Sequence, residues 1–154
     1  MNYETLLMEA ESHQLTIKEK PLKQHDGLIF GNKIAIRTNI PTTTEKACIL
    51  AEELGHYHTT TGNILDQSVT ENRKQELKAR LWAYNKQIGL LGIVKAYQHG
   101  CRNRNEAAEY LEVTEEFLAE AIKAYRSKYG VYATVDNYIV YFEPTIGVME
   151  IVSD

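Results

Sequence analysis

The 154-residue chain has few of the features that mark secreted or membrane-spanning proteins. It holds two cysteines, Cys48 and Cys101, without a Cys-x-x-Cys pair, which favours reduced thiols over a disulfide scaffold. No apolar run approaches the ~18 residues of a membrane span. The first residues lack the basic start and apolar run of a signal peptide. We therefore expect a soluble, cytoplasmic protein with no membrane partner.

An excess of basic charge is also missing, because the formal net charge is −4. This mildly acidic balance gives no case for direct contact with nucleic acid. Apolar residues make up 44% and charged residues 25%, which is ordinary for a globular protein. The length suits one domain with a real core, or one domain with a small appendage. Only three prolines occur and none marks a domain boundary.

Hydrophobic periodicity and capping signals predict a mostly helical chain with a small sheet, an α+β fold. Two apolar runs flank Gly31-Asn32, which is typical of a hairpin with a two-residue turn. Thr42 and Glu45 fit a capping box that opens the next helix. The expected elements are a helix over 3–14, the hairpin over 28–36, helices over 41–60, 72–86 and 88–99, two helices within 105–129, and one or two strands within 132–152.

The segment Leu50-Ala51-Glu52-Glu53-Leu54-Gly55-His56-Tyr57-His58 is almost the His-Glu-x-x-His motif of zinc peptidases. The first histidine of that motif is replaced by Glu52. On a helical wheel, Glu52, Glu53 and His56 share one face, and Leu50 and Leu54 lie on the opposite, aliphatic face.

Ligands four residues apart can hold one ion from the same side, and the glutamate after the first ligand can take a proton from a bound water. The expected metal ligands are therefore Glu52 and His56, with Glu53 as the general base. Glu76, twenty residues beyond His56 on the next helix, is the candidate third ligand. The alternatives are simple i,i+4 pairs, Glu52 with His56 and Glu76 with Arg80.

Two further residues near the motif are weaker candidates. His58 falls on the aliphatic side of the wheel, so we expect a packing or surface histidine. Asp66, ten residues beyond His56, is a loop acid that could fold back toward the site.

The chain resembles the ImmA/IrrE-like metallo-endopeptidases of phages, mobile elements and bacteria. The resemblance rests on residues 51–57 and on Glu76-Leu77-Lys78-Ala79-Arg80-Leu81-Trp82-Ala83, and covers residues 25–90 best. It implies a zincin-like, mostly helical core over residues 1–100, with a helical hairpin and short strands packed on it over 101–154. His56 and Glu76 match metal ligands, Glu53 matches the general base, and Glu52 stands at the first ligand's place.

The resemblance, closest to the phage and prophage branch, implies an endopeptidase that inactivates a phage repressor in the cytoplasm of a bacterial host. Zinc is the implied metal. Glutamate at position 52 would add a second negative charge, lower the Lewis acidity, and shift preference toward Mn or Fe. A metal-free site is the alternative. The chain would then be a non-catalytic binding module that acts as an anti-repressor on a degenerate peptidase scaffold.

Six glutamates and no basic residue occupy positions 106–120, where two helices are expected. A DNA-reading helix needs lysine or arginine, so DNA binding by this pair is disfavoured. A helical hairpin and an acidic docking surface for a basic partner are the remaining interpretations. The run Lys33–Thr38 is the candidate edge strand that would hold an extended substrate beside the metal.

Overall fold

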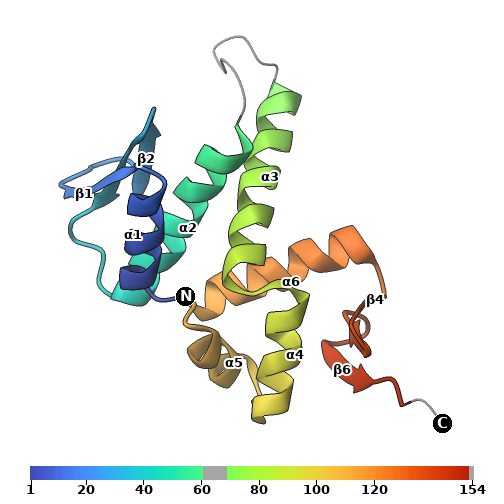
Figure 1. The fold of residues 1–154 in the computed structure, drawn as a ribbon. Helices are drawn as coiled ribbons and strands as arrows, with labels where there is room; N and C mark the ends of the chain where they lie inside the picture. The colour runs from blue at the N-terminus through green and yellow to red at the C-terminus, as the bar shows by residue number, and fades with distance from the viewer. Residues whose placement is uncertain (61–68, 153–154) are drawn as a thin grey trace. The chain divides into compact units, whose positions relative to one another are not determined.

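A computed structural model describes residues 1–60 and 69–152, and the side chains of 69–71 are not described (Figure 1). The chain forms two compact units, Met1–Lys86 and Gln87–Asp154. Helices predominate in both units and each unit contains a small sheet, which confirms the expected α+β class. None of the described helices is long and apolar enough to cross a membrane.

The first unit combines three helices with a three-stranded sheet. The prediction of a helix, a hairpin and two further helices is confirmed, although the connector expected over 64–71 lies largely outside the described residues. The elements in chain order are α1 (Tyr3–Ser12), β1 (Thr16–Lys20), β2 (Gly27–Phe30), β3 (Lys33–Arg37), α2 (Thr43–Thr59) and α3 (Val69–Gln87).

The sheet of the first unit has the strand order β1-β3-β2, with β1 parallel and β2 antiparallel to β3. The hairpin turn is the expected two-residue one, and Gly31 supplies the positive φ of 62°. Strand β1 was not expected from the sequence. Because β1 and β2 flank β3, the prediction that Lys33–Thr38 forms an edge strand is wrong. The hairpin strand that lies at an edge of the sheet is β2.

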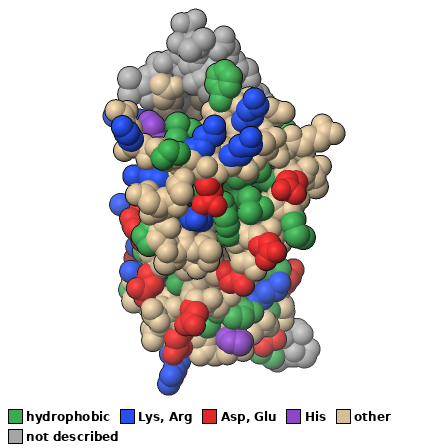
Figure 2. Space-filling model, turned by 90° about the vertical axis from the view of Figure 1, so that its left-hand side faces the viewer, with side chains coloured by type: hydrophobic (Ala, Val, Ile, Leu, Met, Phe, Trp, Pro, Cys, Tyr) green, Lys and Arg blue, Asp and Glu red, His purple; other side chains and the backbone are tan. Residues whose placement is uncertain are grey.

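Each face of this sheet has a different character. Ile34 and Ile36 are buried on the inner face, which α1 and α2 cover (Figure 1). The outer face carries basic and apolar side chains, and both kinds gather in the upper half of Figure 2, which views the molecule from the side of β1 and β2. The inner face therefore forms core, and the outer face is exposed.

Helix α2 begins as expected, because the Thr42 hydroxyl accepts a hydrogen bond from the Glu45 backbone N–H at 3.1 Å. Its aliphatic face is buried, as the wheel predicted, and consists mainly of Ala47, Leu50, Ala51 and Leu54. The helix therefore presents its opposite, carboxylate-bearing face away from the core.

The second unit contains the predicted helical pair within 105–129 and three strands where one or two were expected. Its elements are α4 (Gly89–His99), α5 (Arg104–Leu111), α6 (Glu115–Tyr129), β4 (Tyr132–Val135), β5 (Tyr138–Tyr141) and β6 (Gly147–Glu150). The strands form an antiparallel sheet in the order β4-β5-β6. Fully buried Tyr125, Val140 and Phe142 join α6 to this sheet.

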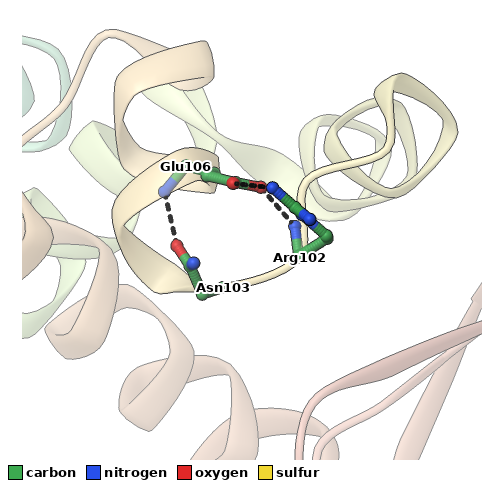
Figure 3. Close-up of polar contacts among 3 residues, drawn as sticks. All are labelled: Arg102, Asn103 and Glu106. Atoms are coloured by element: carbon green, nitrogen blue, oxygen red, sulfur yellow. Dashed lines mark hydrogen bonds and ion pairs between the residues drawn. The ribbon is translucent and has the colours of Figure 1, made fainter.

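Local hydrogen bonds fix the start of α5 (Figure 3). Asn103 Oδ1 accepts from the Glu106 N–H at 2.9 Å, and Glu106 Oε2 accepts from the Arg102 N–H at 2.7 Å. These contacts satisfy backbone donors that the first helical turn leaves open. Five of the six glutamates of the α5–α6 pair are exposed, so the pair is a helical hairpin with an acidic surface. Neither Cys48 nor Cys101, both among the described residues, forms a disulfide.

Candidate active site

The candidate site lies in the first unit, where α2 and α3 come together. The His56 Nε2 atom lies 3.3 Å from Glu76 Oε2, so the structure brings together the motif histidine and the acid of the next helix. The other carboxylate oxygen of Glu76 lies 3.4 Å from Arg80 Nε, which is the i,i+4 pair that the sequence offered as an alternative. Glu76 therefore has both partners at once.

Gly55 allows the two helices to approach this closely. A Cβ atom at position 55 would lie under 3.0 Å from the Ala79 carbonyl carbon and oxygen. Since those are backbone atoms of α3, they cannot move aside without displacing the helix. The glycine of the motif is thus a packing residue that sets the distance between His56 and Glu76.

Glu53, the expected general base, is half-buried beside these residues. Burial, and after it the neighbouring carboxylates Glu52 and Glu76, together raise the pKa of its carboxyl to about 7. A carboxyl group with a pKa near neutrality can accept and return a proton at physiological pH. The raised pKa suits a proton-transfer group, and the role of Glu53 as general base stays a prediction.

Strand β2 passes directly over Glu53. A Cβ atom at Gly27 would lie 2.9 Å from Glu53 Cγ and 3.0 Å from its Oε1, as well as 2.9 Å from Ile49 Cγ2. A larger residue there would have to push the side chains of Glu53 and Ile49 aside. The first residue of the edge strand and the expected base are therefore in contact.

A metal at this site can be tested against the donor atoms. Two atoms bound to one tetrahedral zinc ion lie about 3.3–3.5 Å apart, and the 3.3 Å between His56 Nε2 and Glu76 Oε2 fits this spacing. Among the residues that the structure describes, no group of three or more His, Cys, Asp or Glu side chains is arranged to hold a metal ion. Two donors fit, whereas the assignment of Glu52 as a third ligand stays a prediction.

The two weaker candidates have different outcomes. His58 stacks on Trp82 with ring centroids 4.7 Å apart and meets His13 edge-on at 5.2 Å. Burial and the neighbouring His13 lower the pKa of His58. His58 is exposed and packs against these rings, which agrees with the packing or surface histidine that the wheel predicted. Asp66 lies outside the described residues.

Sequence reasoning missed Gly27 and the packing role of Gly55. An isolated glycine inside or at the start of a strand signals a close approach of another group, so Gly27 could have been suspected from its place before Leu28-Ile29-Phe30. Gly55 was read as part of the motif alone. Its contact depends on the crossing of α2 with α3, which the sequence pattern does not give.

A half-buried glutamate, a histidine–glutamate pair across two helices and a strand close to that glutamate make up the candidate site. The comparison with known families agrees, because the model of the peptidase M78 family, the IrrE N-terminal-like domain, matches residues 10–123. The chain belongs to this family, which is metallopeptidase-like and generally zinc-dependent. No curated protein and no solved structure matches the chain.

The match confirms the resemblance to ImmA/IrrE-like proteins at the level of the family. The matched residues include the whole α2–α3 site and continue through α4 and α5 into α6. The division into residues 1–100 and 101–154 stays a prediction.

Proposed function

We propose that the chain is a metal-dependent endopeptidase of a phage or prophage, which inactivates the phage repressor by hydrolysing a peptide bond. The observation that carries this proposal is the 3.3 Å approach of His56 to Glu76 beside a glutamate whose pKa lies near 7. Membership of a metallopeptidase-like family supports the same class of reaction. The phage setting, the repressor and the bacterial cytoplasm come from the resemblance to the phage branch.

In this proposal His56 and Glu76 would hold the metal, and Glu52 is the third candidate ligand. A bound zinc, or Mn or Fe with this carboxylate-rich set, would supply Lewis acidity and a water of lowered pKa. Glu53 accepts a proton from the attacking water and then donates it to the leaving amine. Arg80 holds the second oxygen of Glu76 and so fixes the orientation of that carboxylate.

Strand β2 is the candidate guide for the substrate. It is one of the two edge strands of its sheet, and it is the one whose first residue lies close to Glu53. An extended peptide that pairs with the free side of β2 would bring one peptide bond to the base. The position of β2 supports this role, which the sequence had assigned to β3.

The proposal is tested by incubating the purified protein with the repressor of the same phage or prophage. Wild type should yield repressor fragments, and Glu53→Gln should yield none because the base is lost while the shape of the side chain is kept. Chelation by EDTA should stop wild-type cleavage, and added zinc should restore it. Fragments produced equally by wild type and Glu53→Gln would exclude this mechanism.

A non-catalytic anti-repressor is the second candidate, and one observation favours it. The described residues do not gather a three-ligand metal group. Metal analysis of the purified protein separates the two functions. Stoichiometric metal that is lost in His56→Ala supports the enzyme. Absence of metal, together with repressor inactivation that survives Glu53→Gln, supports the binding module.

A further inference from the structure

The outer face of the β1-β3-β2 sheet carries a row of basic side chains that has no role in the proposed cleavage chemistry. Alternation along β1 places Lys18 and Lys20 on this face, because Glu19 between them turns to the inner side and pairs with Lys46 of α2. Alternation along β3 adds Lys33 and Arg37, since Ile34 and Ile36 point into the core. Four cations thus occupy two neighbouring strands.

The third strand of this face is apolar. Leu28 and Phe30 of β2 are 44% and 88% exposed, so Phe30 projects almost entirely into solvent. The strand register sets Phe30 beside Lys33, and Leu28 beside Ala35. Figure 2 shows basic and hydrophobic side chains intermixed in the upper half of this view. We call the outward basic and apolar residues of β1, β2 and β3 the basic–apolar face, namely Lys18, Lys20, Leu28, Phe30, Lys33, Ala35 and Arg37.

Charge on this face is only partly balanced. Asp26 forms an ion pair with Arg37, which leaves Lys18, Lys20 and Lys33 as exposed cations with no ion pair described. The whole chain carries a net charge of −4, so this face opposes the overall charge. A concentration of charge opposite to the average is typical of a surface that selects a charged partner.

Among the described residues, no strand pairs with the outward edge of β2, and this edge indicates a polypeptide partner. In an antiparallel pair, hydrogen-bonded and non-hydrogen-bonded residue pairs alternate. The Arg37 N–H donates to the Asp26 carbonyl at 2.8 Å, so the next pair along β2, Gly27 with Ile36, is non-hydrogen-bonded. The main-chain groups of Gly27 and Ile29 therefore point outward from the sheet. A strand of protein matches these donors and acceptors in register, whereas a nucleic acid does not.

We propose that the basic–apolar face docks an acidic segment of the protein substrate that carries apolar side chains and pairs with β2. Apolar side chains of the paired part cover Leu28 and Phe30. Its acidic flank leaves the edge of β2 and crosses the face over β3, first past Lys33 and then to Lys18 and Lys20 on β1. This inference rests on the proposed function, because the same segment leads into the Glu53 site. It specifies the substrate class as acidic-apolar on one side of the cleaved bond.

The test measures binding without cleavage. The full-length Glu53→Gln protein in EDTA is titrated into a fluorescently labelled peptide with an apolar centre and acidic flanks, and the anisotropy is followed at low and at physiological salt. Lys18→Glu with Lys20→Glu should weaken binding about tenfold or more, because attraction becomes repulsion. Phe30→Ser should weaken binding as well, with a smaller salt dependence.

Lys95→Glu with Lys123→Glu is the matched control. Both lysines are exposed on α4 and α6 of the second unit, and the double variant makes the same change in net charge. It should bind the peptide as the parent protein does. Unchanged unfolding midpoints would show that all variants are folded.

Four outcomes overturn the inference. The first is that the acidic peptide does not bind, and the second is that a peptide with lysine in place of each acidic residue binds equally well. The third is that Lys18→Glu with Lys20→Glu leaves binding intact. The fourth is that a labelled oligo-dT strand binds more tightly than the peptide. The last would assign the face to nucleic acid. Because the assay uses a non-cleaving protein without metal, failed repressor cleavage would not affect its result.

Discussion

The two central residues of the motif, Glu53 and Gly55, have opposite relations to stability. Glu53 is held half-buried among other carboxylates, which raises its pKa and costs folding energy when it ionises. Gly55 brings α2 and α3 together and stabilises the fold through that contact. Ionisable groups with strongly shifted pKa values cluster at functional sites, so the raised pKa makes Glu53 a candidate functional residue.

The raised pKa of Glu53 predicts a definite pH dependence of stability. Its pKa is about 7 in the folded chain against 4.5 for an ordinary glutamate, so the folded state binds more protons between these values. Stability from this group is complete below pH 4.5 and is lost as the pH rises through 7. For metal-free protein we expect a loss on the order of 2–3 kcal/mol across this range.

Glu53→Gln removes this loss, and the variant should be more stable than wild type above pH 7. Urea unfolding in EDTA across the pH range measures the difference. Glu120→Gln, at an exposed position of α6, should leave the wild-type curve unchanged. Parallel stability curves for Glu53→Gln and wild type would contradict the assignment of a perturbed carboxyl at position 53.

Gly55→Ala tests the close approach of α2 to α3. The new methyl would meet the Ala79 backbone, so we expect a loss of about 1–3 kcal/mol in the free energy of unfolding, together with weaker metal retention. Gly92→Ala in α4 is the matched control. Its Cβ would lie 3.4 Å from Leu111 Cδ2, an ordinary contact, so the better helix former should gain about 0.5–1 kcal/mol. Equal effects of the two substitutions would disprove the packing role.

At the scale of elements, β2 combines two properties that no other strand of the first unit has together. It is an edge strand of the sheet, and its first residue, Gly27, lies close to Glu53. The outward main-chain groups of Gly27 and Ile29 are therefore placed to pair with a substrate strand.

Ile29→Pro tests whether this edge guides the substrate. Proline removes the outward N–H of residue 29 but none of the hydrogen bonds to β3, so the fold should persist with a modest loss of packing. Repressor cleavage should fall by an order of magnitude or more in kcat/KM, because the substrate loses a register-setting bond. Ile29→Val keeps the N–H and should cleave as wild type does. Normal cleavage by Ile29→Pro would exclude the guide role.

Local signals explain why the helices and the hairpin could be predicted and why the order of the sheet could not. Thr42 and Glu45 predict the start of α2, and Gly31-Asn32 predicts the turn, because the capping bond and the turn each involve residues close together in the sequence. Strand β1 holds a single aliphatic residue, Ile17, and pairs with a strand seventeen positions away in a parallel register. Without β1, the central strand β3 looked like an edge.

The candidate site was predictable to the same extent. Helical periodicity placed Glu53 and His56 on one face, and the motif on the next helix identified Glu76. The approach of Gly27 to Glu53 depends on how the sheet packs on α2, which is a property of the tertiary structure. Whether Glu52 joins His56 and Glu76 depends on side-chain positions within a fraction of an ångström, which no sequence pattern specifies.

For the whole molecule, the division into Met1–Lys86 and Gln87–Asp154 separates the chemistry from the acidic helical pair. His56, Glu76 and Glu53 all belong to the first unit, as does the basic–apolar face. The exposed glutamates of α5 and α6 belong to the second. Binding of a metal should therefore act on one unit more than on the other.

Hydrogen exchange of the full-length protein in zinc and in EDTA tests this division. A ligand present at 100 times its Kd stabilises the folded state by about 2.7 kcal/mol. We expect slower exchange on zinc binding in the C-terminal half of α2 and around Glu76 in α3, since these segments supply the donors. Amides of α5 and α6 should exchange at the same rate in both conditions. His56→Ala should abolish the zinc effect, whereas His99→Ala, at an exposed position of α4, should preserve it. Zinc protection that is equal in both units, or that survives His56→Ala, would show that the metal binds elsewhere. A complete lack of zinc protection in wild type would favour the anti-repressor that acts by contact alone.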